Sequence, residues 1–212
     1  EYPADKRMFI VDIMKKFELC YDIETDKTFL IPDLLPKDEP FTGEWGNALA
    51  FQIHYNVLPS SIISRFIVRM NTFMHKTVWR SGIVLVNNGN NALVKADAEE
   101  HKIYIWVNGE EATRRDLLSV IRAEFEVIHK TIAKIEAYEY VPHPQYPDLL
   151  FPYQELLQFE RDNIKEFPKS FDGKTIMVDV GQLLDGVANP NERNQSRPSR
   201  HITDNHPTQP RT

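Results

Sequence analysis

The spacing of apolar residues changes several times along this chain, and each change predicts a different element. Apolar residues at three-residue steps, flanked by Asp and Lys, predict a helix over residues 6–19. Two short strands then flank a turn at residues 24–27. The stretch 32–46 is rich in Pro, Asp, Glu and Gly, which is typical of a linker. A helix followed by a hairpin is the back half of a winged-helix-like unit.

A second and larger unit begins near Ala48. Strict alternation over residues 49–55 predicts a half-buried strand. A continuous apolar stripe then predicts a helix over residues 60–74. The stripe consists of Ile62, Ile63, Phe66, Ile67, Met70, Phe73 and Met74. Further patterns predict strands at 78–86, 92–96 and 102–107, a long helix at 114–135, a strand at 138–141, a helix at 152–167 and a strand at 175–180.

These elements together predict an α+β fold in which helices pack on a largely antiparallel sheet. The remnant of the winged-helix-like subdomain and its linker occupy residues 1–45, and the α/β unit occupies residues 46–186. Residues 187–212 are almost all polar, and such a segment buries too little apolar area to order itself. We therefore expect a flexible tail there.

The amino-acid composition excludes several classes of function. The chain has 212 residues and a net charge of −6, whereas a domain that follows a phosphate backbone is normally basic. Cys20 is the only cysteine, so neither an internal disulfide nor a thiolate metal cage can form, which fits a reducing cytoplasm. No apolar run approaches the roughly 20 residues that span a bilayer. The charged start at Glu1, without a methionine, suggests a piece of a longer protein.

The sequence offers little that resembles an active site. Gly173-Lys174-Thr175 ends like a phosphate-binding loop, but the full motif needs a glycine where the chain has Pro168, and it needs a helix after the loop. A turn is the better interpretation. The seven histidines show no metal-ligand spacing, and the acidic pairs Glu99-Glu100 and Glu110-Glu111 lie at predicted turns. We predict no catalytic, cofactor-binding or metal site.

Two features indicate surface contacts. Arg65 and Arg69 lie four residues apart on a helix, where like charges repel unless an acid faces them. They are either solvated or part of a docking face for an acidic partner. The ladder of apolar residues from Leu118 to Ile135 either packs on the chain's own sheet or forms an interhelical seam.

Several separate motifs, in matching order over residues 8–186, resemble the COR domain, the "C-terminal of Roc" region of Roco proteins. The matching stretches are Met14–Cys20, Leu30–Pro36, Tyr55–Pro59, Arg65–Arg69, Trp79–Leu85 and Val178–Gly186.

The resemblance implies a function. In Roco proteins a Ras-like GTPase domain, Roc, precedes COR, and COR pairs two chains so that GTP binding and hydrolysis in Roc couple to the balance of dimer and monomer. This chain then holds the end of the N-terminal COR half and all of the C-terminal half, and GTP or GDP binds only in the absent Roc domain. The expected partners are a second copy and Roc. We place the pairing contacts at Arg65, Phe66, Arg69, Trp79 and Arg80.

Two alternatives stay open. A winged-helix nucleic-acid module would use the basic residues between Lys6 and Lys27. A hydrolase would have an active site whose residues are too dispersed along the sequence to recognise.

Overall fold

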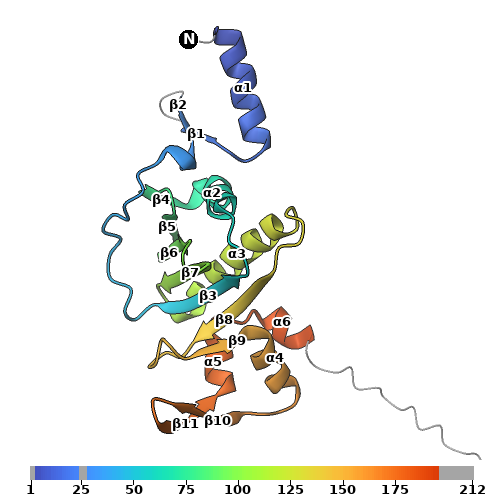
Figure 1. The fold of residues 1–212 in the computed structure, drawn as a ribbon. Coiled ribbons are helices and arrows are strands. Elements are labelled where there is room, and N and C mark those ends of the chain that lie inside the picture. The colour runs from blue at the N-terminus through green and yellow to red at the C-terminus, as the bar shows by residue number, and fades with distance from the viewer. Residues whose placement is uncertain (1–2, 24–27, 196–212) are drawn as a thin grey trace, which may run out of the picture.

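The structure, a computed structural model, describes residues 3–23 and 28–195 of the chain (Figure 1). Its N-terminal part is a helix and a two-stranded hairpin, followed by a short 3-10 helix and a long linker. These elements are α1 (Ala4–Lys16), β1 (Tyr21–Ile23), β2 (Thr28–Leu30) and η1 (Pro32–Leu34). The turn predicted at residues 24–27 lies outside the described residues.

A seven-stranded antiparallel sheet forms the centre of the larger unit. Its strands are β3 (Leu49–Tyr55), β4 (Met74–Trp79), β5 (Gly82–Asn87), β6 (Asn90–Asp97), β7 (Lys102–Asn108), β8 (Ala137–Pro142) and β9 (Leu150–Pro152). They lie in the order β4-β5-β6-β7-β3-β8-β9, so β3, the first of these strands along the chain, lies inside the sheet between β7 and β8. The predicted α+β class with an antiparallel sheet is confirmed.

Helices pack on one face of this sheet. They are α2 (Ser60–Arg69), the 3-10 turn η2 (Asn71–Phe73), α3 (Glu111–His129), α4 (Tyr153–Arg161) and α5 (Val180–Val187), with the short α6 (Pro190–Gln195) after them. Their buried side chains join Phe51, Ile53 and Ile105 of the sheet in one large core. A separate hairpin of β10 (Glu166–Phe171) and β11 (Lys174–Asp179) adds Phe167 and Phe171 to its edge.

The opposite face of the sheet carries a smaller cluster. Trp79, Val84 and Leu93 are buried there, and Trp45 of the linker packs on them. Figure 1 shows the linker, residues 35–48, running down the side of the sheet away from α3. A hydrogen bond from the Arg80 amide to the Pro36 carbonyl (2.9 Å) attaches it to the sheet edge.

Several predicted boundaries are wrong, and side-chain hydrogen bonds explain two of them. The helix predicted over 60–74 ends at Arg69, because the Asn71 amide donates to the Val68 carbonyl (2.5 Å) and the chain turns into η2. The long helix ends at His129 rather than 135, where the Thr131 hydroxyl donates to the Ile128 carbonyl (2.6 Å).

Other differences concern whole elements. The single strand predicted over 78–86 is two strands, β4 and β5, joined by a tight turn. The helix predicted over 152–167 stops at Arg161, and β10 follows. The tail predicted from residue 187 begins instead with the end of α5 and with α6, whose Arg193 pairs with Asp185 and Glu160. Residues 196–212 lie outside the described residues.

A candidate regulatory site at the junction of the N-terminal segment and α2

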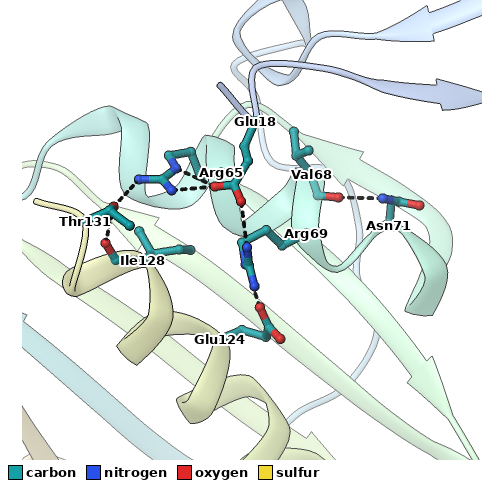
Figure 2. Close-up of polar contacts among 8 residues, drawn as sticks. All are labelled: Glu18, Arg65, Val68, Arg69, Asn71, Glu124, Ile128 and Thr131. Carbon is teal, nitrogen blue, oxygen red and sulfur yellow. Dashed lines mark hydrogen bonds and ion pairs between the residues drawn. The ribbon is translucent and has the colours of Figure 1, made fainter. Parts of the chain in front are cut away.

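The two arginines that the sequence singles out face an acid of the same chain. The Glu18 carboxylate accepts from Arg65 (Nε to Oε2, 2.7 Å) and from Arg69 (Nη1 to Oε1, 2.6 Å), so one carboxylate bridges both guanidinium groups (Figure 2). It therefore relieves the repulsion that two like charges four residues apart on a helix would otherwise feel. We call these three residues the Glu18 clamp.

The clamp extends to α3. Arg69 Nε donates to Glu124 Oε2 (2.6 Å), and Arg65 Nη1 donates to the Thr131 hydroxyl (2.6 Å) just beyond the helix (Figure 2). Beneath these polar contacts, Phe66 and Phe125 stack in parallel with their ring centroids 4.3 Å apart. The N-terminal segment is thus joined by charge to two helices that are already joined by packing.

Glu18 is held in a backbone conformation that does not suit it. It follows the C-cap of α1 with φ +56°, and the amides of Glu18 and Leu19 close the helix by donating to the carbonyls of Lys15 (3.0 Å) and Met14 (2.9 Å). Glycine normally occupies this left-handed position, and a side chain there costs about 1–2 kcal/mol. The carboxylate also lies at the negative end of the helix dipole. The tertiary ion pairs outweigh both local penalties.

Electrostatics at the clamp follow from its partial burial. Burial opposes ionisation of Glu18, but hydrogen bonds and charges from Arg65 and Arg69 outweigh it and lower the pKa of the carboxyl group. Burial likewise opposes the charge of Arg69, whereas its bonds to Glu124 and Glu18 raise the pKa of its guanidinium group. Glu18 and Arg69 are therefore both charged near neutral pH.

A second contact ties η1 to α2. The Ser64 hydroxyl, on a residue only 4% exposed, donates to Asp33 Oδ1 (2.6 Å) in η1. The stretch from Glu18 to Asp33 is consequently bonded to α2 at both of its ends.

The five residues predicted as pairing contacts do not form one surface. Phe66 and Trp79 are 0% and 1% exposed and belong to the two cores of the single chain. Arg65 and Arg69 lie in the clamp, and Arg80 lies at the turn between β4 and β5 beside the linker. Contact of these residues with a partner stays a prediction. Glu18 and Glu124 were missed, because no spacing in the sequence relates them to Arg65 and Arg69.

The other candidate residues have structural positions. Gly173 (φ +71°) forms the turn between β10 and β11, as the turn interpretation predicts. Glu110 and Glu111 begin α3, and Glu99 and Glu100 lie in a turn closed by Asp97 Oδ1. Within residues 3–23 and 28–195, no three His, Cys, Asp or Glu side chains are grouped as metal ligands.

A second polar network lies on another side of α3. Arg122 pairs with Glu139 of β8 (2.8 Å) and Glu192 of α6 (3.1 Å), and its guanidinium carbon lies 4.3 Å from the Tyr153 ring centroid. Burial opposes the charge of Arg122, and the Glu139 carboxylate raises the pKa of its guanidinium group. A half-open cavity of about 570 Å³ lies beside this network. Because both carboxylates are already bonded to Arg122, the network fastens α6 to the domain.

The basic residues of the helix–hairpin unit are partly neutralised. Lys15 pairs with Asp22 (2.7 Å) and lies over the Phe29 ring at 5.0 Å. This arrangement weakens the nucleic-acid alternative, because one of its few lysines is already paired.

Comparison with known proteins identifies the domain. The family described as "C-terminal of Roc, COR-B domain" matches residues 46–186, and the chain belongs to that family. COR-B is a non-catalytic domain of Roco proteins, in which it accompanies the Roc domain. No helix in the part of the chain that the structure describes is long and apolar enough to cross a membrane.

One curated relative is a much larger protein. The chain is 25% identical over 143 residues to the probable serine/threonine-protein kinase pats1 of Dictyostelium discoideum. The match covers 58% of this chain and 4% of that protein, so the chain spans only a small part of the relative's length.

Proposed function

We propose that this chain is the pairing and regulatory module of a Roco G protein. It holds two chains together and positions the neighbouring Roc GTPase domain, so that GTP binding and hydrolysis in Roc couple to the balance of dimer and monomer. Membership of the COR-B family supports the assignment to a Roco protein. The location that fits this module is the cytoplasm.

The Glu18 clamp is the observation that carries the regulatory part of the proposal. In a Roco chain Roc precedes COR, so a movement of Roc reaches the COR-B unit through α1, the hairpin and the linker. Glu18 lies in that path, and a strained residue held by tertiary contacts is typical of a functional position. A contact held by charge at a partly exposed position can also be broken and remade, unlike the stacked core beneath it.

Exposed apolar residues on α1 support a neighbour at the N-terminal side. Met8 and Phe9 of α1 are 54% and 66% exposed, and Phe17, the C-cap residue that follows the helix, is 67% exposed. Apolar side chains gathered on one short helix normally mark an interaction site. We assign this surface to the remainder of the N-terminal COR half and to Roc.

Pairing of the chains and GTP binding in Roc are thermodynamically linked in this proposal. If GTP-bound Roc disfavours the paired state, pairing must disfavour GTP binding by the same coupling free energy, typically about 1–3 kcal/mol. The clamp would carry that coupling between the N-terminal segment and α2.

The test compares the dimerisation constants of a Roc-containing chain with GDP and with a GTP analogue. Glu18→Gln should reduce the difference between the two constants, because the segment that Roc moves is no longer fastened to α2. Glu155→Gln, the same chemical change at an exposed position of α4, is the matched control. An unchanged nucleotide effect in Glu18→Gln would remove the clamp from the mechanism.

A further inference from the structure

A threonine hydroxyl lies at the edge of the Glu18 clamp, in the chain that follows α3. Thr131 Oγ1 accepts a hydrogen bond from Arg65 Nη1 (2.6 Å) and donates one to the Ile128 carbonyl (2.6 Å) (Figure 2). Thr131 is exposed, whereas Arg65 is half-buried. An enzyme in solution can therefore reach a group that is bonded directly to a clamp arginine.

The segment around Thr131 suits the approach of an enzyme. Residues 130–136 join α3 to β8 and contain neither helix nor strand. Ile132 and Ile135 pack against the core, and the two residues before each of them are exposed. An enzyme that modifies a side chain must draw the chain into its active site, and exposed irregular segments open at a lower cost than helices or strands. The position of Thr131 therefore favours modification of its hydroxyl group.

The charges of the clamp are balanced while Thr131 is unmodified. Two guanidinium groups face two carboxylates, Glu18 between both arginines and Glu124 beside Arg69. A phosphate group on threonine carries about −1.5 to −2 charge at pH 7 and three strong acceptor oxygens. On Thr131 it replaces a neutral acceptor beside Arg65. Three anionic groups then share two guanidinium groups.

Glu18 is the anion that loses most in this competition. A guanidinium group binds phosphate through two parallel hydrogen bonds, and the second donor beside Arg65 Nη1 is Nη2, which now pairs with Glu18 Oε2 (2.5 Å). Glu18 also has a left-handed backbone at φ +56° and lies at the negative end of the α1 dipole, whereas Glu124 lies within α3. The phosphate therefore weakens the pair of Glu18 with Arg65 first.

We propose that Thr131 is a phosphorylation site, and that its phosphate loosens the N-terminal segment from α2 by taking Arg65 from Glu18. A protein kinase transfers the γ-phosphoryl group of ATP to Thr131 Oγ1. The oxygen–phosphorus bond forms as the bond from phosphorus to the β,γ-bridging oxygen breaks, ADP leaves, and the hydroxyl proton passes to a base of the kinase. The inference rests on the proposed regulatory function, because it adds a control to the same clamp.

The expected loosening is confined to the stretch between Glu18 and η1. Asp33 keeps its hydrogen bond to Ser64, and Tyr21 stays in the large core. The amides of β1 and β2 should therefore exchange with solvent faster, whereas those of β3 and β7 inside the sheet should not change. Loss of one partly exposed ion pair corresponds to about three- to tenfold faster exchange.

The test uses the 212-residue chain with phosphothreonine introduced at Thr131 during translation. Hydrogen exchange compares its β1, β2, β3 and β7 amides with those of the unmodified chain. Phosphorus NMR measures the second pKa of the phosphate, ordinarily about 6, which contact with Arg65 should lower and Arg65→Gln should restore. In Glu18→Gln, where the carboxylate charge is already lost, phosphorylation should change the exchange of β1 and β2 much less.

A matched control carries phosphothreonine at Thr175, an exposed residue of β11, and should leave β1 and β2 unchanged. If phosphorylated Thr131 leaves β1 and β2 equally protected, or if β3 and β7 exchange faster by the same factor, the loosening mechanism is wrong.

Mass spectrometry of the whole protein from its own cells tests the modification itself. The peptide that contains Thr131 should carry phosphate, and its recovery solely in unmodified form would overturn the site. These measurements involve neither pairing nor nucleotide, so the proposed function can fail while this inference holds, and the reverse.

Discussion

Replacing Glu18 with different residues should separate the stability contributed by its side chain from the cost of its backbone conformation. The side chains of Glu18, Arg65 and Arg69 are 24%, 18% and 26% exposed, between a surface pair and a buried one. Exposed ion pairs contribute about 0.2–1 kcal/mol, and buried hydrogen bonds to charged groups about 1.5–3 kcal/mol. We therefore expect about 1 kcal/mol for each arginine, and a loss of about 2 kcal/mol in Glu18→Ala.

The left-handed backbone conformation of Glu18 lowers the stability of the chain, whereas its ion pairs raise it. Glu18→Gly loses the same ion pairs, but it relieves the left-handed conformation at φ +56°. That relief is worth about 1 kcal/mol, so Glu18→Gly should be more stable than Glu18→Ala by about that amount. Glu18→Gln keeps the strain and the size of the side chain, but it loses the charge and turns an amide donor toward one of the two arginines, so it should resemble Glu18→Ala.

Urea unfolding followed by circular dichroism measures these differences, and hydrogen exchange of the β1 and β2 amides shows whether the loss is local. About 1 M salt should lower the stability of the wild type toward that of Glu18→Gln, because it screens the ion pairs. If Glu18→Ala and Glu18→Gly unfold at the same urea concentration, the argument from backbone strain is refuted. If Glu18→Gln matches the wild type, the clamp contributes no stability.

Three further predictions follow from buried groups. Phe66→Ala should lower the free energy of unfolding by about 3–5 kcal/mol, because the ring is fully buried against Phe125; a residue that served only as a dimer contact would leave the stability of the monomer unchanged in urea. Gly82→Ala should lower the thermal midpoint, because a Cβ there collides with the Trp79 ring, whereas Gly46→Ala, with nothing within 4 Å, should not. Burial lowers the pKa of His129 in the folded chain, so below pH about 6.5 the unfolded chain binds this proton more readily than the folded chain, and the free energy of unfolding decreases as the pH decreases. Urea titrations at several pH values should show a smaller decrease in His129→Gln.

The spacing of apolar residues correctly predicted the helices and strands in which that spacing alone defines the buried face. The alternation over 49–55 and the stripe from Ile62 to Met70 correspond to β3 and α2, because each buries the face that its period defines. The boundaries failed where a side chain competed with the periodicity. Asn71 ended α2 before Phe73, although Phe73 still packs against the core. Ile132 and Ile135 likewise continue the apolar ladder of α3 outside the helix.

The candidate site was only half predictable. Arg65 and Arg69 were conspicuous as like charges four residues apart, which left them either solvated or part of a docking face for an acidic partner; the acid that faces them belongs to the same chain. Their partner Glu18 lies 47 residues before Arg65, and only the tertiary fold brings it there. A glutamate where a helix end favours glycine is a weak signal that could have indicated it. The burial of Phe66 and Trp79 could not be separated from a role at an interface, because aromatic residues dominate both environments.

The most direct test of the pairing and regulatory role is the solution mass of a chain that carries both Roc and this module, measured across a range of concentrations with GDP and with a non-hydrolysable GTP analogue. The account predicts a reversible dimer whose dissociation constant changes with the nucleotide, by about 5- to 150-fold for a coupling of about 1–3 kcal/mol. A dimer with the same constant in both nucleotide states would contradict the coupling, and a monomer in both would contradict the pairing itself.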